Sequence, residues 1–111
     1  MTGLRQDFPL ISSIVEIDMF VLISYDIPDD RRRTKVMKAL KNYGRHVQYS
    51  VFECELKPEA YQALRARLDP LIAVKEDNVR YYFFDEDAIR KIESVGVGGQ
   101  VARTQPVYVI G

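Results

Sequence analysis

The stretch MFVLISY, residues 19–25, constrains the fold more than any other part of this 111-residue chain. Its side chains are apolar at nearly every position, so it predicts a strand whose two faces are both covered. The chain then reaches Asp26, turns through IPDD and enters a basic run. We therefore expect a carboxylate at the end of a buried strand, next to the start of a cationic helix.

The basic run has the pattern of a helix. Asp29 or Asp30 can cap its start, because a short carboxylate accepts hydrogen bonds from the first free N–H groups. Gly44 suits the left-handed backbone position that commonly follows a helix end. The apolar residues that predict the inner stripe of this helix are Val36, Leu40 and Tyr43.

Further helices and strands are predicted downstream. Residues 45–56, RHVQYSVFECEL, favour one strand, or two with a bend near Ser50, although no Gly, Pro or Asn marks a turn. Pro58 suits the first position of a helix that runs to Ile72, and Pro70 kinks or ends it. The remaining predictions are a strand over 79–84, a short helix over 85–93 and a C-terminal strand over 106–110.

This order predicts an α+β fold with two helices on one face of an antiparallel sheet, the ferredoxin-like βαββαβ sandwich. The domain spans residues 19–95, an N-terminal extension precedes it over 1–18, and 96–111 form a Gly-rich joint and an added strand. Since the helices cover only one face, a symmetric second copy is expected on the other. The C-terminal strand pairs either within its own chain or with the partner's sheet.

The formal net charge of zero conceals an uneven distribution. Residues 31–46 carry seven Lys and Arg and no acid, whereas acids gather in 53–59 and 85–93, so we expect one basic face that attracts polyanions.

A hydrophobic content of 47% excludes a disordered chain. The single cysteine fits a reducing compartment, and no apolar run reaches the ~18 residues of a membrane helix. A cytoplasmic location without a membrane partner is therefore expected.

Three stretches together resemble a known family. YDIPDDRRR after the first strand, then YGRHVQYSVFECEL, then VRYYFF are similar in order and spacing to the smaller of the two universal CRISPR-associated spacer-acquisition proteins, a family described as metal-dependent endonucleases. The resemblance covers residues 19 to about 95, and 1–18 lie outside the family pattern. It implies a ferredoxin-like homodimer in which Asp26 of each subunit faces its counterpart across the two-fold axis, and the pair holds a Mg²⁺.

The resemblance also implies an activity and partners. Some members cleave single-stranded RNA and others double-stranded DNA, and during spacer acquisition the dimer bridges integrase subunits along the DNA. We therefore expect a CRISPR adaptation protein that is a Mg²⁺-dependent endonuclease and a dimeric bridge. The main alternative is a non-catalytic DNA-binding scaffold for the integrase. An RNA-binding sandwich and a ligand-binding regulatory dimer of the same fold are further alternatives.

Asp26 is the candidate catalytic and metal-binding residue. Hard divalent cations take oxygen ligands, and Mg²⁺ typically uses one or two carboxylates while it keeps several waters. From the residues alone, an Asx-type cap of the turn is the favoured explanation of Asp26, whereas the resemblance favours the metal ligand. Asp29 fits a helix cap, and a place near the metal is its alternative.

The candidate nucleic-acid-binding residues are Arg31, Arg33, Lys35, Lys38 and His46. A cationic helix without acids is unusual for a merely solvated face, because helices gain from mixed-sign pairs at i,i+4. Arg33 is closest to the arginine position of the family. Lys35 and His46 stand where arginine is common, and neither has the planar fork of arginine.

Tyr25, Ser50 and Phe52 are candidates for contacts near the metal or for stacking on bases. Packing in the core is the alternative for the two aromatic residues and is favoured on strands, and Ser50 alternatively serves only as a bend. Cys54 is expected to be a small buried apolar residue and not a nucleophile, because the only histidine would have to act as its base.

Overall fold

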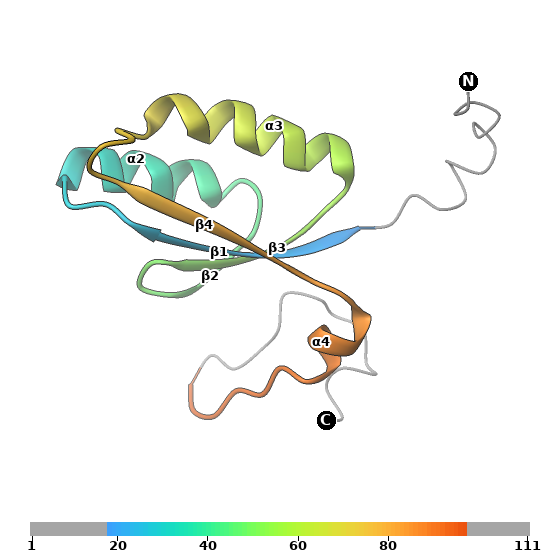
Figure 1. Ribbon diagram of the computed structural model, residues 1–111. Coiled ribbons are helices and arrows are strands. Elements are labelled where there is room, and N and C mark those ends of the chain that lie inside the picture. The colour runs from blue at the N-terminus through green and yellow to red at the C-terminus, as the bar shows by residue number, and fades with distance from the viewer. Residues whose placement is uncertain (1–17, 98–111) are drawn as a thin grey trace, which may run out of the picture.

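The computed structural model describes residues 18–97 and contains one four-stranded antiparallel sheet of order β2-β3-β1-β4. The elements are β1 (Met19–Asp26), α2 (Asp30–Leu40), β2 (Arg45–Gln48), β3 (Val51–Leu56), α3 (Pro58–Leu68), the 3₁₀ turn η1 (Asp69–Leu71), β4 (Asn78–Phe84) and α4 (Glu86–Arg90). Helices α2 and α3 lie side by side on one face of the sheet (Figure 1). The predicted ferredoxin-like fold is therefore confirmed.

The main core lies between the sheet and these two helices. Alternation along β1 points Val21, Ile23 and Tyr25 toward α2 and α3, and all three are buried. The residues that meet them from the other elements are Val36, Ala39 and Leu40 of α2, Phe52, Cys54 and Leu56 of β3, and Leu64 and Leu68 of α3. This layer fixes β1 as a central strand, with β3 and β4 on either side.

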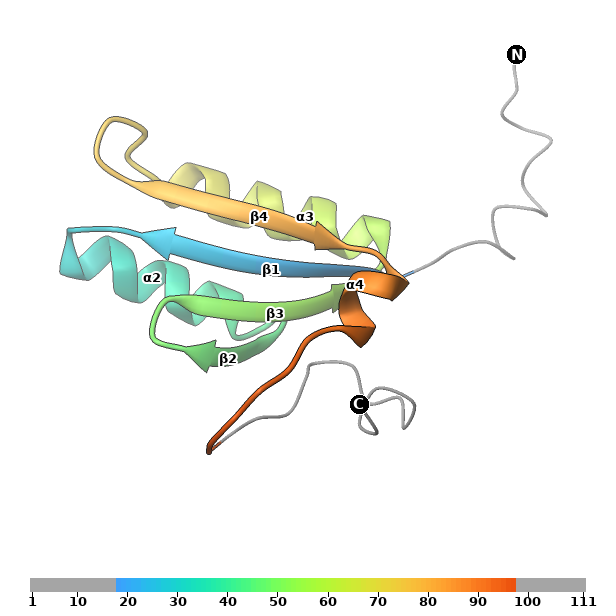
Figure 2. The ribbon, with the colours of Figure 1, turned by 60° about the horizontal axis from the view of Figure 1, so that its bottom comes forward.

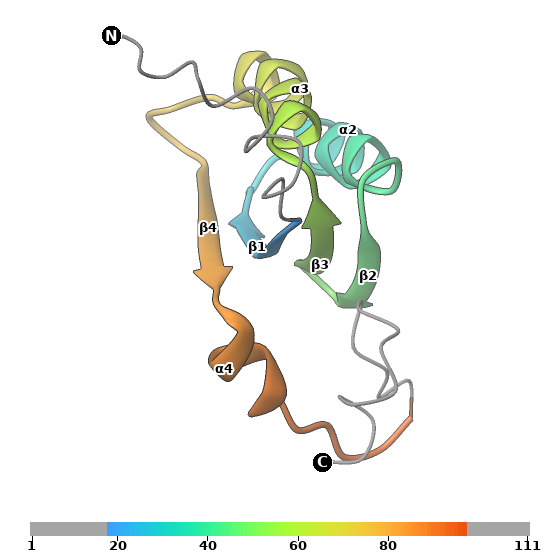
Figure 3. The same cartoon turned by 90° about the vertical axis from the view of Figure 1, so that its right-hand side faces the viewer.

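The opposite face of the sheet is covered at one end only. Phe20 is 1% exposed, and its ring lies 5.6 Å from that of Phe84 in β4. Figure 3 shows α4 on this side of the sheet, and its Ile89 is buried. Farther along β1, Leu22 and Ser24 are half-buried. The expectation that both faces of β1 are covered is therefore met at the Phe20 end, within the part of the chain that the structure describes.

Strands β2 and β3 form a hairpin that turns at Tyr49 and Ser50, which confirms the bend near Ser50. The backbone N–H of Tyr25 donates to the Ser50 carbonyl at 3.1 Å, which fastens the turn to β1. The His46 ring stacks on Phe52 with centroids 4.5 Å apart, and its Nε2 lies 2.9 Å from the Tyr49 carbonyl oxygen. These contacts with other segments explain a turn that has no Gly, Pro or Asn.

The prediction of a left-handed backbone at Gly44 is wrong. The positive-φ glycine among the described residues is Gly96, whereas α2 ends with a right-handed cap at Lys41. Gly44 instead lies against β3: a Cβ there would come 2.3 Å from Cys54 Sγ and 2.5 Å from the Glu53 carbonyl oxygen. Close approach of two backbones, and not the local dihedral, therefore requires the glycine.

The second predicted helix is shorter than expected. α3 ends at Leu68, and Pro70 lies within η1, so Ile72 is outside the helix. Pro70 lacks the N–H that would continue the helical ladder, which explains the change to a 3₁₀ turn. The predicted strand over 106–110 lies outside the described residues. Within residues 18–97, none of the helices combines the length and the apolar character that crossing a bilayer demands.

Candidate functional site

Asp26 is the last residue of β1, and it is exposed. The pleat that buries Val21, Ile23 and Tyr25 points Asp26 toward the opposite, open face of the sheet, which Figure 2 shows in front of α2 and α3. Asn78, the first residue of β4, is its partner in the antiparallel ladder. The predicted catalytic carboxylate therefore lies at a strand end on the open face.

The turn between β1 and α2 is held by side chains of α2. Asp29 caps the helix, because its Oδ2 accepts a hydrogen bond from the Arg32 backbone N–H at 2.9 Å. Arg33 Nη1 donates to the carbonyl oxygens of Ile27 at 2.9 Å and Pro28 at 3.4 Å. Asp30 pairs with the same guanidinium and raises the pKa of Arg33. Arg33 thus holds the turn behind Asp26, and its expected contact with a phosphate stays a prediction.

Sequence reasoning missed the partners of Arg32. Its Nε donates to Asp77 Oδ2 at 2.8 Å, and its Nη2 donates to Asp77 Oδ1 at 3.1 Å and to Glu76 at 2.9 Å. The hydrogen bond from Arg32 is the main cause that lowers the pKa of Asp77. These acids precede β4, more than 40 positions along the chain, so no local pattern around α2 reveals them.

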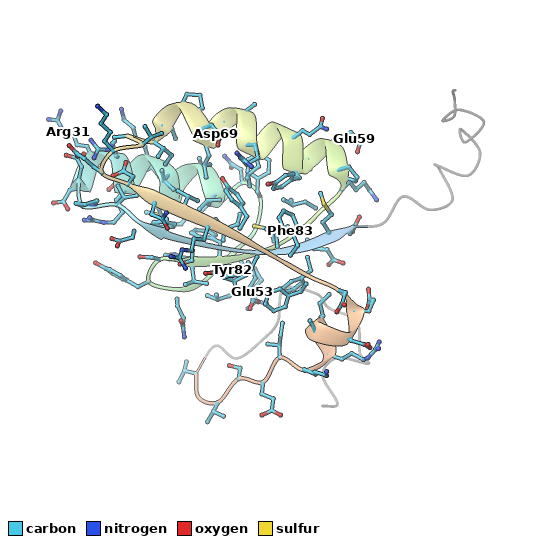
Figure 4. The ribbon with its side chains drawn as sticks, in the orientation of Figure 1. Arg31, Glu53, Glu59, Asp69, Tyr82 and Phe83 are labelled. Atoms are coloured by element: carbon cyan, nitrogen blue, oxygen red, sulfur yellow. The ribbon has the colours of Figure 1, made fainter. Side chains whose placement is uncertain are left out.

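The remaining predicted cations of α2 form a stripe on its outer side. Arg31, Lys35 and Lys38 are exposed and follow one another at helical spacing, i, i+4 and i+7. None of them makes an ion pair with another described residue. Figure 4 shows Arg31 at the end of α2 that follows β1. We call these three residues the basic stripe.

The other predicted site residues lie around the β2–β3 turn. Tyr25 and Phe52 are 5% and 0% exposed, so both rings pack in the core, which agrees with the alternative favoured for aromatic residues on strands. Burial is the main cause that raises the pKa of Tyr25. Ser50 contacts the end of β1 through its carbonyl oxygen, and His46 is exposed beside Phe52. His46 thus lies beside Phe52, on the face of the sheet that carries α2 and α3.

The metal-binding capacity of one chain is small. Among residues 18–97, no group of three or more His, Cys, Asp or Glu side chains is close enough to hold a metal ion. Asp26 nevertheless supplies an exposed carboxylate, and Asn78 across the ladder adds an amide oxygen, which also accepts from Arg80 at 3.2 Å. Mg²⁺ fits one or two carboxylates with several waters. The donor set therefore fits Mg²⁺ best if a second chain adds its own Asp26.

Comparisons with known proteins show which family the chain resembles. A family model described as CRISPR associated protein Cas2 matches residues 19–92. The chain is 44% identical over 93 residues to CRISPR-associated endoribonuclease Cas2 1 of Chloroflexus aurantiacus, which covers 83% of this chain and 100% of that protein.

Two solved structures extend the likeness to three dimensions. Streptococcus pyogenes Cas2 at pH 6.5 has a TM-score of 0.63 and 34% identity, with 70% of this chain and 100% of that chain covered. A chain of a partial Cas6-RT-Cas1–Cas2 complex has a TM-score of 0.61 and 31% identity, with 78% and 98% covered. The family resemblance of the sequence is thus confirmed, and the chain belongs to the Cas2 family of CRISPR-associated proteins.

Proposed function

We propose that this chain acts in CRISPR adaptation as a homodimeric, divalent-metal-dependent endonuclease that hydrolyses phosphodiester bonds and also bridges integrase subunits. The observation that carries the proposal is the exposed Asp26 at the end of β1, on the open face of the sheet. A relative named as an endoribonuclease supports the nuclease activity. The likeness to a chain of a complex that includes Cas1 supports the integrase partner.

The open face supports a symmetric dimer. Leu22 and Val51 are half-buried there, and Tyr82 is 42% exposed. Figure 4 shows Tyr82 and Glu53 on this side, away from α2 and α3. A second copy that packs its own open face here covers these side chains. Because Asp26 lies on the same face, the two-fold axis can bring both carboxylates together.

The two Asp26 carboxylates would hold one Mg²⁺ between the subunits. When bound, the ion would supply an activated water and neutralise the charge that builds on the scissile phosphate. The chain's own contribution is to hold the carboxylate at a fixed strand end, through the Arg33 contacts with the turn and the ladder to Asn78.

The basic stripe is the proposed contact with nucleic acid. Lys38 follows Arg31 by seven positions, which is about 10 Å along the helix axis. Cations at this spacing can neutralise successive phosphates of single-stranded RNA or double-stranded DNA. Contacts with phosphates position the strand without reading its sequence, which suits a protein that handles many different spacers.

The test compares wild-type protein with Asp26→Asn on labelled single-stranded RNA and double-stranded DNA, in Mg²⁺ and in chelator. We expect metal-dependent cutting that disappears in Asp26→Asn, because the amide cannot replace the anionic ligand. Asp87→Asn on α4 is the matched control and should cut like the wild type. Light scattering and circular dichroism establish that each variant is dimeric and folded. Full cutting by a folded, dimeric Asp26→Asn protein would refute the assigned site.

A non-catalytic scaffold is the second candidate. It is favoured by the single carboxylate per chain and by the absence of a larger acidic cluster among the described residues. If neither the wild type nor Asp26→Asn cuts, while both are dimeric and bind DNA with the integrase, the scaffold replaces the nuclease as the function.

A further inference from the structure

We propose that Arg32 and Asp77 are positioning residues for Asp26. Their ion pair joins the first turn of α2 to the segment before β4, and so fixes the strand end that carries the carboxylate. We call this pair the Arg32–Asp77 tie. The inference deepens the proposed function and rests on it for the role of Asp26.

The geometry of the tie is more specific than that of an ordinary ion pair at the surface. The Arg32 fork engages both Asp77 oxygens, with Nε–Oδ2 at 2.8 Å and Nη2–Oδ1 at 3.1 Å. The Asp77 side chain is 0% exposed, and the Arg32 side chain is 28% exposed. Asp77 Oδ2 also accepts the Ala73 backbone N–H at 2.9 Å, which closes the turn before β4. Bidentate pairs of this kind add geometric specificity as well as attraction.

With the tie, a continuous series of contacts surrounds Asp26. Asp77 directly precedes Asn78, which pairs with Asp26 in the ladder. On the other side, the chain runs from Asp26 through the turn to Asp29, whose side chain accepts the Arg32 N–H at 2.9 Å. Arg32 therefore holds both segments that lead away from the Asp26–Asn78 pair, one by its backbone and one by its side chain.

Stability alone is a weak reason for such a pair. Replacement of a buried ion pair by apolar residues is often neutral or stabilising, because desolvation offsets the attraction. The end of a strand ladder, in contrast, opens easily, and a metal ligand must be held within about 0.5 Å of its working position. Asp26 and Asn78 are the last pair of the β1–β4 ladder. A rigid fork at this end restrains the one place where fraying would displace the carboxylate.

The experiment uses Arg32→Lys and Asp77→Asn in the full chain. Arg32→Lys keeps the charge and removes the fork, whereas Asp77→Asn keeps the shape and removes the charge. Arg65→Lys is the matched control, because Arg65 of α3 makes a similar two-point contact with Asp69 of η1, at 3.0 and 3.1 Å. Hydrogen exchange is followed at the backbone amides of residues 24–27, 29 and 78–80 and, for comparison, at the β1–β3 ladder.

We expect amide exchange around Asp26 and Asn78 to accelerate on the order of tenfold in both tie variants, with the β1–β3 amides unchanged. Cutting should fall about 10–100-fold through kcat, with half-saturation by Mg²⁺ moved to higher concentration and KM for the nucleic acid unchanged. Arg32→Lys should lose less than Arg32→Ala. Arg65→Lys should change neither readout.

Unchanged exchange at Asp26 and Asn78 in the tie variants would overturn the inference, and so would acceleration spread evenly over the whole sheet, since that pattern describes a general loss of stability. A wild-type protein that does not cut would count against the proposed nuclease instead. The local exchange pattern would then decide the tie by itself.

Discussion

At Gly44 the backbone of the segment after α2 passes directly against β3. The hydrogen that stands in place of a side chain there is the only substituent that the Cys54 sulfur and the Glu53 carbonyl allow. Gly44 also donates its N–H to the Leu40 carbonyl oxygen at 3.1 Å, so the segment cannot move away without a lost hydrogen bond. This single residue therefore links the end of α2 to the middle of the sheet.

We predict that Gly44→Ala lowers the free energy of unfolding by about 1–3 kcal/mol, the usual range for overpacking. Urea denaturation monitored by circular dichroism measures the change. Cys54→Ala combined with Gly44→Ala should recover part of the loss, because the 2.3 Å contact with sulfur is removed and the 2.5 Å contact with the Glu53 oxygen remains. A Gly44→Ala protein as stable as the wild type would contradict this explanation.

Residues of the candidate site differ in how far local sequence reveals them. Asp26 and Asp29 are predictable, because a strand end and a helix cap depend on neighbouring residues only. The roles of Arg32 and Arg33 are not, since three consecutive arginines look alike until the fold brings Asp77 and the turn carbonyls to two of them. Charge counted along a helix therefore does not reveal which cations have partners within the chain.

At the scale of the element, the cationic side chains of α2 point in two different directions. Arg32 and Arg33 face other parts of the chain, whereas Arg31, Lys35 and Lys38 face outward. The helical period alone predicts that such a division exists, but which acids occupy the inner side depends on the 73–77 turn. The boundary of α3, in contrast, follows from a residue that is visible in the sequence, because Pro70 lacks the N–H that would continue the helix.

We predict that Lys35→Ala combined with Lys38→Ala weakens DNA binding and makes it less sensitive to salt. The slope of log K against log salt should become shallower by about 2, since each lost phosphate contact contributes about 0.9. Lys91→Ala, just after α4 on the other side of the sheet, is the control. Fluorescence anisotropy at a series of salt concentrations measures both. An unchanged slope in the double variant would exclude the basic stripe as the DNA contact.

At the scale of the whole molecule, the core holds several groups that resist losing a proton. Burial raises the pKa of Cys54 from 9.0 to about 12 and that of Tyr81 from 10.0 to about 12. The folded protein therefore keeps protons that the unfolded chain releases between these limits. Since stability falls with pH wherever the folded state binds more protons, the contribution is fully present below about pH 9 and is lost toward pH 12.

We predict that the free energy of unfolding declines as pH rises above about 9, and that Cys54→Ala makes the first part of this decline shallower. Tyr81→Phe should act on the part above about pH 10. Urea titrations at a series of alkaline pH values measure the effect. Equal slopes in the wild type and both variants would show that other groups control alkaline unfolding.

The sequence predicts the class of the sheet but not the complete order of its strands. Alternating helix and strand patterns predict two helices over an antiparallel sheet, and the position of MFVLISY as the most apolar strand indicates that it is central. The extent of cover on the open face was not predictable, because it depends on where α4 lies. The second copy proposed above would cover more of this face, and the two pairings expected for the C-terminal strand concern residues outside the described part of the chain.

The pairing of β1 with β4 has a consequence for the time course of synthesis. Asp26 leaves the ribosome 52 residues before its ladder partner Asn78, by subtraction of their numbers. At typical elongation rates this interval is roughly 3–10 s. During this interval β1, the most apolar segment of the chain, can pair with β3, but β4 has not yet been synthesised. A nascent chain that stops before residue 78 therefore carries the carboxylate but cannot yet hold it in place.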